Sequence, residues 1–458
     1  MIFSSSIFLF AFLPAVLILH FIAGKKLKNW VLLLASLFFY AWGEPVNVLV
    51  MIASILINYA GCLWMAGSTR KKPILVLLLV LNIGTLFYFK YLNFALETWT
   101  ALTGHDPGLR KVALPIGISF FTFQIMSYVI DVYRGKVEPQ KNVVSLGLYI
   151  SLFPQLIAGP IVRYADIERE IRSRTVTVDK VYEGFRRFAI GFAKKVIIAD
   201  QLGALADTVF AGSYPSVWGH WIGILAYTLQ IYYDFSGYSD MAIGLGRCFG
   251  FTFLENFNYP YISRSVREFW RRWHMSLSGW FRDYLYIPLG GSRKGVLRTY
   301  LNLLIVFFVT GLWHGASFNF IVWGLYYGLF LIIERVGFGK LLDKAPRVLG
   351  HLYTLLIVIV GWVFFRADTL ADALVYLQHM VTPYGNDLVN FHMIMDNRYW
   401  FILALGILCA MPYQKLLARV RSTKAGSVLA DIAVILVFLL AISFMFGSGY
   451  SPFLYFRF

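Results

Sequence analysis

The chain is a succession of apolar segments separated by short polar or basic stretches. Apolar runs lie at residues 1–23, 29–42, 46–66, 73–95, 112–133, 143–162, 217–250, 299–333, 350–365, 400–412 and 428–447. A transmembrane helix needs about 20 mostly apolar residues to cross a hydrocarbon core of roughly 30 Å. The pattern therefore predicts an all-α polytopic membrane protein.

The run at 299–333 is too long to be a single membrane helix. It contains no Asp, Glu, Lys or Arg, and as one helix it would be about 50 Å long. Gly311 and Gly315 are the most favourable places for a break, and they flank Trp313 and His314. We therefore expect His314 at membrane depth on a broken helix, where a polar ring needs a partner or a water-filled cavity. The alternative is a structural histidine that hydrogen-bonds two packed helices.

Two further regions depart from a simple helix that crosses the membrane. Residues 163–200 interleave Arg and Lys with Phe and Val, which is typical of an amphipathic helix in the membrane interface. The segment at 143–162 is predicted to be a further membrane span, and its Pro154 and Pro160 predict that it has a kinked or re-entrant end. Residues 96–111 are predicted to form a polar loop.

The basic residues predict how the chain crosses the membrane. Residues 1–23 carry no Asp, Glu, Lys or Arg, and the first basic cluster, at 25–28, follows them. This order is the reverse of a cleavable signal peptide. We expect a retained first helix with its N-terminus outside, and a cytoplasmic C-terminus. The block at 264–298 holds eight basic residues against two acidic ones, so it is also predicted to be cytoplasmic.

Composition narrows the class further. The chain has 458 residues, of which 59% are hydrophobic, and a net charge of +17. In a soluble protein that charge would suggest nucleic acid. Here the basic residues form short clusters between apolar segments, so topology and anionic lipid headgroups explain them and no nucleic-acid partner is expected. The three cysteines show no paired spacing, and they predict neither a disulfide framework nor a zinc site.

Histidine chemistry remains after the common enzyme signatures are excluded. The sequence has no Gly-x-Ser-x-Gly elbow, Walker A loop, Gly-x-Gly-x-x-Gly fingerprint or His-Glu-x-x-His helix. A neutral imidazole can take the proton of a hydroxyl as it attacks an acyl carbonyl. His274, which follows Arg271-Arg272-Trp273, is the second candidate after His314; alternatively, it is an interfacial histidine in a basic block. The arginines suit the phosphates of a cytoplasmic donor or a carrier protein, or they only set topology.

Two carboxylates lie in the apolar segment at 217–250. Asp234 and Asp240 belong to the sequence Asp-Phe-Ser-Gly-Tyr-Ser-Asp. Carboxylates in such a segment are costly, so we expect them to cap helices, to pair with a cation or to line a polar cavity.

Several stretches together resemble the membrane-bound O-acyltransferase superfamily, in its bacterial branch of alginate O-acetylation subunits and related polysaccharide O-acetyltransferases. They are residues 114–135, 153–163, 234–246, 255–291, 311–315 and 452–458. The most specific is 255–291, which begins Glu-Asn-Phe-Asn-Tyr-Pro-Tyr and contains Arg-Arg-Trp-His at 271–274. Together with Gly-Leu-Trp-His-Gly at 311–315, it makes a strong signal over nearly the whole chain.

The resemblance implies a fold and an activity. The fold would have about 11 transmembrane helices, with interfacial and re-entrant helices, around a thinned central funnel. Residues 1–458 would form one integral membrane domain with a catalytic core at about 112–335. An acetyl group would pass from a cytoplasmic thioester, acetyl-CoA, to the outer face of the cell membrane. A separate extracytoplasmic transferase of the Ser-Gly-Asn-His type, or another acceptor-side subunit, would place it on an exported or cell-wall polysaccharide. No tightly bound cofactor or metal is implied.

The resemblance also assigns site residues. His314 matches the invariant histidine of the family, and His274 matches the second motif histidine. The same motifs suggest a set of residues that bind the donor or substrate: Arg271, Arg272, Trp273, Trp313, Asp234, Asp240 and Asn256.

Three other functions stay open. A related enzyme type moves D-alanine from a carrier protein toward teichoic acid. A transporter would also place charges and broken helices at the membrane midplane, but it would be expected to show repeat symmetry, which the sequence lacks. A non-catalytic scaffold for polysaccharide export would not need either histidine.

Overall fold

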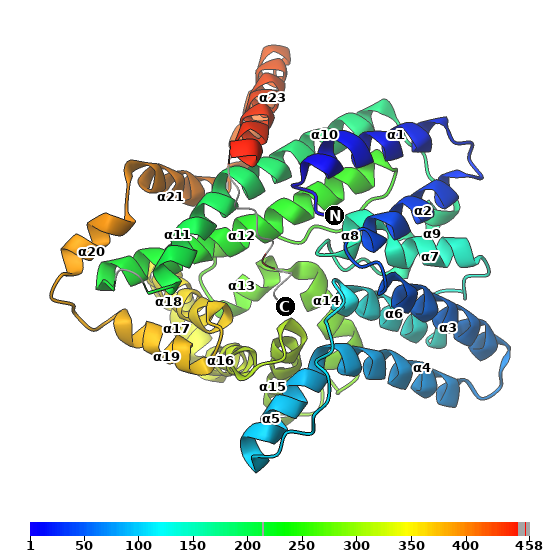
Figure 1. Cartoon of the computed structure of the whole chain (residues 1–458), viewed down its shortest axis with the longest axis horizontal. Coiled ribbons are helices and arrows are strands. Elements are labelled where there is room, and N and C mark those ends of the chain that lie inside the picture. The colour runs from blue at the N-terminus through cyan, green and yellow to red at the C-terminus, as the bar shows by residue number, and fades with distance from the viewer. Residues whose placement is uncertain (213–214, 448–453, 455–458) are drawn as a thin grey trace. The chain divides into compact units, whose positions relative to one another are not determined.

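The computed structural model shows a helical chain, with no strand among residues 1–212, 215–447 and 454, which are the residues described (Figure 1). The side chains of residues 414 and 415 are not part of this description. The expected cytoplasmic C-terminus and most of the motif at 452–458 also lie outside the described residues. The all-α class is confirmed.

The chain divides into two compact units, one with residues 1–188 and 241–254, the other with residues 189–240 and 255–458. The boundaries at 188 and 240 fall within α10 (Val178–Ala193) and α12 (Val217–Cys248). The expectation of one integral domain with a core at 112–335 stays a prediction.

The first unit contains the N-terminal helices. They are η1 (Phe8–Phe12), α1 (Leu13–Ile22), α2 (Lys28–Ala41), α3 (Val48–Gly67), α4 (Lys71–Leu86), η2 (Phe87–Tyr91), α5 (Leu92–Thr103), α6 (Ile118–Tyr133), α7 (Val143–Ser151), α8 (Phe153–Leu156) and α9 (Tyr164–Arg172), where η marks a short π- or 3-10 helix.

The second unit contains the C-terminal helices. They are η3 (Lys194–Ala199), α11 (Asp200–Phe210), η4 (Pro260–Ile262), α13 (Val266–Arg272), α14 (Met275–Phe281), η5 (Arg282–Tyr286), α15 (Val296–His314), α16 (Phe318–Ile333), η6 (Glu334–Phe338), α17 (Gly339–Lys344), α18 (Arg347–Arg366), α19 (Leu370–His379), α20 (Asp387–Ile394), α21 (Asn397–Cys409), α22 (Gln414–Arg421) and α23 (Lys424–Gly447).

The predicted loop at 96–111 is wrong over its first half. The helix of α4 continues through η2 into α5 and ends only at Thr103. No Gly or Pro interrupts residues 92–103, whereas Gly104 adopts the left-handed conformation (φ 70°) that terminates a helix.

The segment at 143–162 is not one membrane span. Helix α7 has nine residues, which at 1.5 Å each gives about 13 Å. The chain then forms the single turn of α8, with Pro154 near its start, and continues without regular structure. Residues 151–162 are all buried, as irregular backbone at membrane depth must be. The predicted break is confirmed, but the prediction of a full crossing is wrong.

The break predicted in the apolar run at 299–333 is confirmed. Helix α15 ends at His314, Gly315 is extended, and α16 begins at Phe318. The two helices cross at glycines, because a Cβ on Gly311 would overlap the carbonyl oxygen of Phe320 and a Cβ on Gly324 that of Phe307. Small residues at such a crossing let two membrane helices approach closely.

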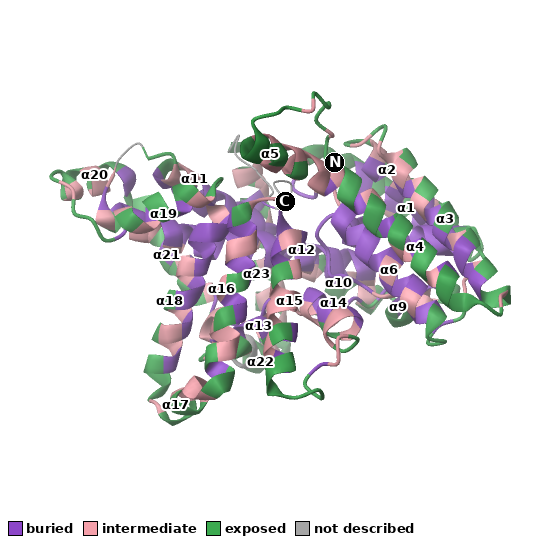
Figure 2. Ribbon diagram, turned by 90° about the horizontal axis from the view of Figure 1, so that it is seen from below, coloured by how far each residue is buried: buried purple, intermediate pink, exposed green. Residues whose placement is uncertain are grey.

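The apolar helices fit a multi-pass membrane protein. Six helical stretches are long and apolar enough to cross a membrane, and four shorter apolar helices have 10–17 residues, among the described parts of the chain. The expected number of about 11 crossings is not confirmed. Helix α18 is exposed where it begins, next to α17, and buried where it ends (Figure 2). Its buried end supplies Trp362 and Phe365, which are 1% and 2% exposed.

Candidate active site

His314 lies at the end of a helix, inside an aromatic cage. It is the last residue of α15, and Gly315 continues in an extended conformation (φ −163°). His314 is 4% exposed. The centroid of its ring lies 5.0 Å from the rings of Trp313 and Trp323 and 5.1 Å from that of Phe365. All three pairs are edge-to-face, so aromatic packing holds the imidazole in one orientation.

His274 lies in a strained connection between α13 and α14. Its backbone is left-handed (φ 44°, ψ 54°), and Tyr259 is the only other non-glycine residue with positive φ in the described chain. Such a conformation costs about 1–3 kcal/mol and persists only where the surroundings impose it. His274 is 1% exposed, so packing holds both its backbone and its ring.

Asn256 connects the His274 ring to its surroundings. Its Oδ1 lies 3.0 Å from Nδ1 of His274 and accepts hydrogen bonds from the hydroxyl (2.9 Å) and backbone N–H (3.3 Å) of Ser276. Its Nδ2 donates to the hydroxyl of Ser239 at 3.1 Å, and its carbonyl accepts from the N–H of Met275 at 3.0 Å. Asn256 is therefore a structural link between α12, the strained connection and the start of α14.

The two candidate histidines meet on one indole ring. The ring of Trp313 lies 6.1 Å from that of His274 and 5.0 Å from that of His314. Phe235 of α12 also contacts His274, with ring centroids 4.6 Å apart. Nothing in the spacing of the sequence predicted this meeting, and it makes a shared site possible.

The carboxylates of α12 form ion pairs, of which that of Asp234 is buried and that of Asp240 half-buried. Asp234 lies 2.8 Å from Nζ of Lys195, and Asp200 lies 2.6 Å from the same nitrogen. Asp240 pairs with Lys194 at 2.7 Å. Of the three roles expected for Asp234 and Asp240, the structure thus shows pairing with a cation, and their proposed contact with a donor stays a prediction.

The sequence comparisons agree with this geometry. Residues 139–365 match the model of MBOAT, the membrane-bound O-acyltransferase family. The peptidoglycan O-acetyltransferase of Helicobacter pylori is 33% identical over 100% of this chain and 98% of its own length. The chain belongs to the membrane-bound O-acyltransferase family. The resemblance seen in the sequence is confirmed, and the protein is an O-acyltransferase.

Two other relatives of this O-acyltransferase show how far the similarity extends. The probable alginate O-acetylase AlgI of Pseudomonas aeruginosa is 49% identical over 81% of this chain and 73% of its own length. The teichoic acid D-alanyltransferase of Bacillus subtilis is 30% identical over 50% of this chain and 60% of its own length.

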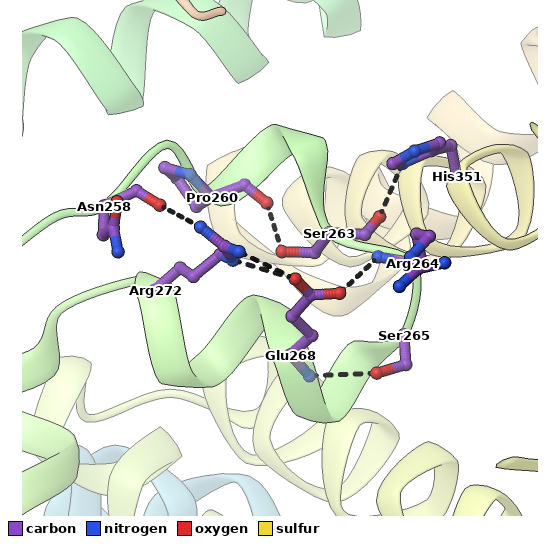
Figure 3. A network of polar contacts seen from close by, with 8 residues as sticks. All are labelled: Asn258, Pro260, Ser263, Arg264, Ser265, Glu268, Arg272 and His351. Atoms are coloured by element: carbon purple, nitrogen blue, oxygen red, sulfur yellow. Dashed lines mark hydrogen bonds and ion pairs between the residues drawn. The ribbon is translucent and has the colours of Figure 1, made fainter. Parts of the chain in front are cut away.

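The two arginines before His274 differ in what they can do for the acyltransferase. Arg271 is exposed, whereas Arg272 binds Glu268 through Nε (3.0 Å) and Nη2 (2.9 Å) and the carbonyl of Asn258 through Nη1 (3.1 Å) (Figure 3). Burial acts to raise the pKa of Glu268, but hydrogen bonds from the Arg264 N–H and from Arg272 outweigh it and lower the pKa. Arg272 therefore stabilises the loop, whereas Arg271 is exposed, and donor binding by either arginine stays a prediction.

Trp273 is a core residue of the acyltransferase. It is 3% exposed, and its ring lies 5.0 Å from those of Phe257 and Trp362 and 5.5 Å from that of Phe269. Trp273 therefore packs in the core directly before His274 in the chain, and its predicted contact with a donor stays a prediction.

One residue that sequence reasoning missed is Glu334. Its carboxylate, in η6, accepts hydrogen bonds from the backbone N–H groups of Val266 (2.6 Å) and Arg267 (3.0 Å), where α13 begins. The signal was available, because Glu334 is the first charge after the apolar run at 299–333. A carboxylate so close to the end of an apolar helix needs a partner.

Proposed function

We propose that this protein transfers an acetyl group from a cytoplasmic thioester donor, acetyl-CoA, across the cell membrane for O-acetylation of an exported or cell-wall polysaccharide. The observation that carries the proposal is the meeting of two buried histidines on Trp313. The names of the relatives support acetyl as the group and a cell-surface polymer as the destination.

The reaction is an acyl transfer with a histidine base. A hydroxyl of the acceptor attacks the carbonyl carbon of the thioester, so that a C–O bond forms and the C–S bond breaks. His314 takes the hydroxyl proton and gives it to the departing sulfur, which leaves as a thiol. His274 orients the reacting groups or assists the proton transfer. The aromatic cage around His314 excludes water, which would otherwise hydrolyse the thioester.

The donor and the acceptor would reach the site from opposite sides of the membrane. Arg271 and its basic neighbours in 264–298 suit the phosphates of acetyl-CoA on the cytoplasmic side. On the outer side, an extracytoplasmic transferase of the Ser-Gly-Asn-His type or another acceptor-side subunit would accept the acetyl group. No tightly bound cofactor or metal takes part in this proposal.

The second candidate is D-alanyl transfer from a carrier protein toward teichoic acid. The similarity to the Bacillus subtilis D-alanyltransferase favours it, although that similarity covers half of this chain. The two candidates differ in the donor, because one needs an acyl-CoA and the other a protein-bound thioester. Transport and scaffolding are different in kind, because neither consumes a thioester.

The proposal is tested by following labelled acetyl-CoA in proteoliposomes that contain the purified protein and an acceptor-side partner. We expect wild type to release CoA and His314→Ala to do so at least about 100-fold more slowly, as for loss of a general base. His314→Gln, which keeps a polar side chain, separates loss of chemistry from loss of folding. The matched control is His105→Ala, because His105 is exposed in a loop.

The outcomes separate the candidate functions. Equal rates for wild type and His314→Ala, at equal abundance, would overturn the catalytic role of His314. No consumption of acetyl-CoA by wild type, together with consumption of a D-alanyl carrier protein, would establish the second candidate. If the protein consumes neither donor, transport or scaffolding would be the remaining candidate functions.

A further inference from the structure

We propose that Asn256 is a positioning residue that holds His274 as the tautomer with hydrogen on Nδ1, so that Nε2 presents a lone pair to a hydroxyl or thiol proton in the site. The catalytic role of this tautomer rests on the proposed function. The structural part of the proposal, the tautomer, stands on the hydrogen bonds alone.

The first step is the orientation of the Asn256 amide. The backbone N–H of Ser276 points to one terminal atom of Asn256 at 3.3 Å. A backbone N–H can only donate, so that atom must be the acceptor, the carbonyl oxygen Oδ1. The other terminal atom, Nδ2, donates to the hydroxyl of Ser239 at 3.1 Å, which agrees with this orientation.

The second step is the tautomer of His274. Nδ1 lies 3.0 Å from the same oxygen, Oδ1 of Asn256. Two acceptors do not make a hydrogen bond, so Nδ1 must carry a hydrogen and donate it. A neutral imidazole has one N–H, and therefore Nε2 is an acceptor with a free lone pair.

The third step is the state of Nε2. This nitrogen is buried and has no hydrogen-bond partner in the described part of the chain. An unsatisfied buried acceptor costs about 1–3 kcal/mol, and in native structures such a group calls for an explanation. A substrate hydroxyl or thiol that donates to Nε2 supplies that partner during the reaction.

The protonation state agrees with this role. Burial lowers the pKa of His274 to about 3, so the ring is neutral at physiological pH. The groups that pack on it are Asn256, Ser276, Phe235 and Trp313, none of which is charged. Trp313 also contacts the ring of His314, with centroids 5.0 Å apart.

The direct test is nitrogen NMR of the full chain labelled with ¹⁵N-histidine in nanodiscs. His274→Gln identifies the His274 signals by difference. We expect a protonated Nδ1 and an unprotonated Nε2 in wild type, and a mixture of both tautomers in Asn256→Leu. A wild-type ring with hydrogen on Nε2, or a tautomer that is unchanged in Asn256→Leu, would overturn the proposal.

The functional test is acetyl transfer as a function of pH. Loss of a residue that orients a functional histidine lowers activity about 10–100-fold. We therefore expect the kcat of Asn256→Leu to fall by this factor, with little change in KM. Asn256→Asp keeps the acceptor oxygen but adds a negative charge that stabilises the imidazolium. Its activity should therefore recover toward wild type as pH rises.

The matched controls are Asn258→Leu and Asn258→Asp. Asn258 lies two residues further along the same loop, is exposed, and uses its backbone groups to bind Arg272. These variants should keep wild-type kcat and pH profile, and an equal loss at both positions would contradict a specific role for Asn256. The NMR result does not depend on turnover, so failure of the acetyltransferase proposal and failure of the tautomer proposal are distinguishable.

Discussion

At the scale of single residues, the site depends on side chains that are buried and held in place. His314 is held by aromatic edges and His274 by an amide, and both are almost completely buried. The two histidines therefore differ in how they are held: ring contacts pack around His314, whereas Nδ1 of His274 is bound to Asn256.

His274 should make the stability of the protein depend on pH. The group lies outside the candidate membrane spans, and burial lowers its folded-state pKa to about 3, from about 6.5 in the unfolded chain. Below pH 6.5 the unfolded chain binds a proton that the folded chain does not, so stability falls as pH decreases from 6.5 toward 3. Above pH 6.5 this effect disappears.

The measurement is the Tm in detergent at pH 7.5 and at pH 5. Between pH 7.5 and pH 5, the Tm of wild type should fall further than the Tm of His274→Gln, which has no ring to protonate. His105→Gln is the control, because His105 is exposed in a loop and its removal should leave the pH dependence unchanged. Identical pH dependence in wild type and His274→Gln would rule out this coupling.

At the scale of elements, α13 is positioned by carboxylates at its start. Glu268 binds the Arg264 N–H and the Arg272 guanidinium, while Glu334 accepts from the first two N–H groups of the helix. Ser265 caps the helix, because its hydroxyl oxygen accepts a hydrogen bond from the N–H of Glu268 at 3.0 Å. A helix of seven residues gains little stability from its own hydrogen bonds, so these contacts determine where it lies.

Replacing Glu334 should loosen α13. In Glu334→Ala the N–H groups of Val266, which is buried, and of Arg267, which is exposed, lose their acceptor. Leaving the buried group unsatisfied costs about 1–3 kcal/mol. We expect a lower Tm and slower acetyl transfer, with Glu334→Gln intermediate because it keeps one acceptor oxygen. Differential scanning fluorimetry and the proteoliposome assay measure the two effects.

Glu97→Ala is the matched control for Glu334→Ala. Glu97 forms an ion pair with Lys111 at 2.7 Å, but their side chains are 61% and 80% exposed. Such a surface pair contributes about 0–1 kcal/mol, so its loss should change neither Tm nor transfer appreciably. A loss of Tm in Glu97→Ala as large as that in Glu334→Ala would contradict the capping role.

At the scale of the whole molecule, the proposed function needs a defined orientation in the membrane. The N-terminus should be outside, and the basic block at 264–298 should face the cytoplasm, where the donor is. Within the first unit, the loop at 104–111 follows α5, at the opposite end of the α4–α5 helix from the basic residues at 70–72.

Cysteine labelling tests this orientation. Ser292 is exposed within the basic block, so Ser292→Cys should react with a membrane-impermeant maleimide only after the cells are permeabilised. Asp106→Cys, in the exposed loop after α5, should react in intact cells. Cys409 is half-buried and is replaced by Ser in both variants, whereas Cys62 and Cys248 are buried. Labelling of Ser292→Cys from outside would reverse the proposed direction of transfer.

The sequence alone determined the all-α membrane class, most helix positions and the break before Gly315. These features follow from local physics: a bilayer requires apolar segments of a certain length, and glycine permits the chain to leave a helix. The motifs at 271–274 and 311–315 also identified the two histidines. Where local signals were weak, as at 96–103 and in the short helix α7, the sequence-based prediction was wrong.

Only the tertiary structure decided which of these residues meet. It placed both histidines on Trp313, paired Asp234 and Asp240 with lysines, and showed Asn256 as a partner of His274. Contacts of this kind join helices that are far apart in the sequence. They depend on how side chains of several helices pack together, and the hydrophobic pattern of any one segment carries no information about that packing.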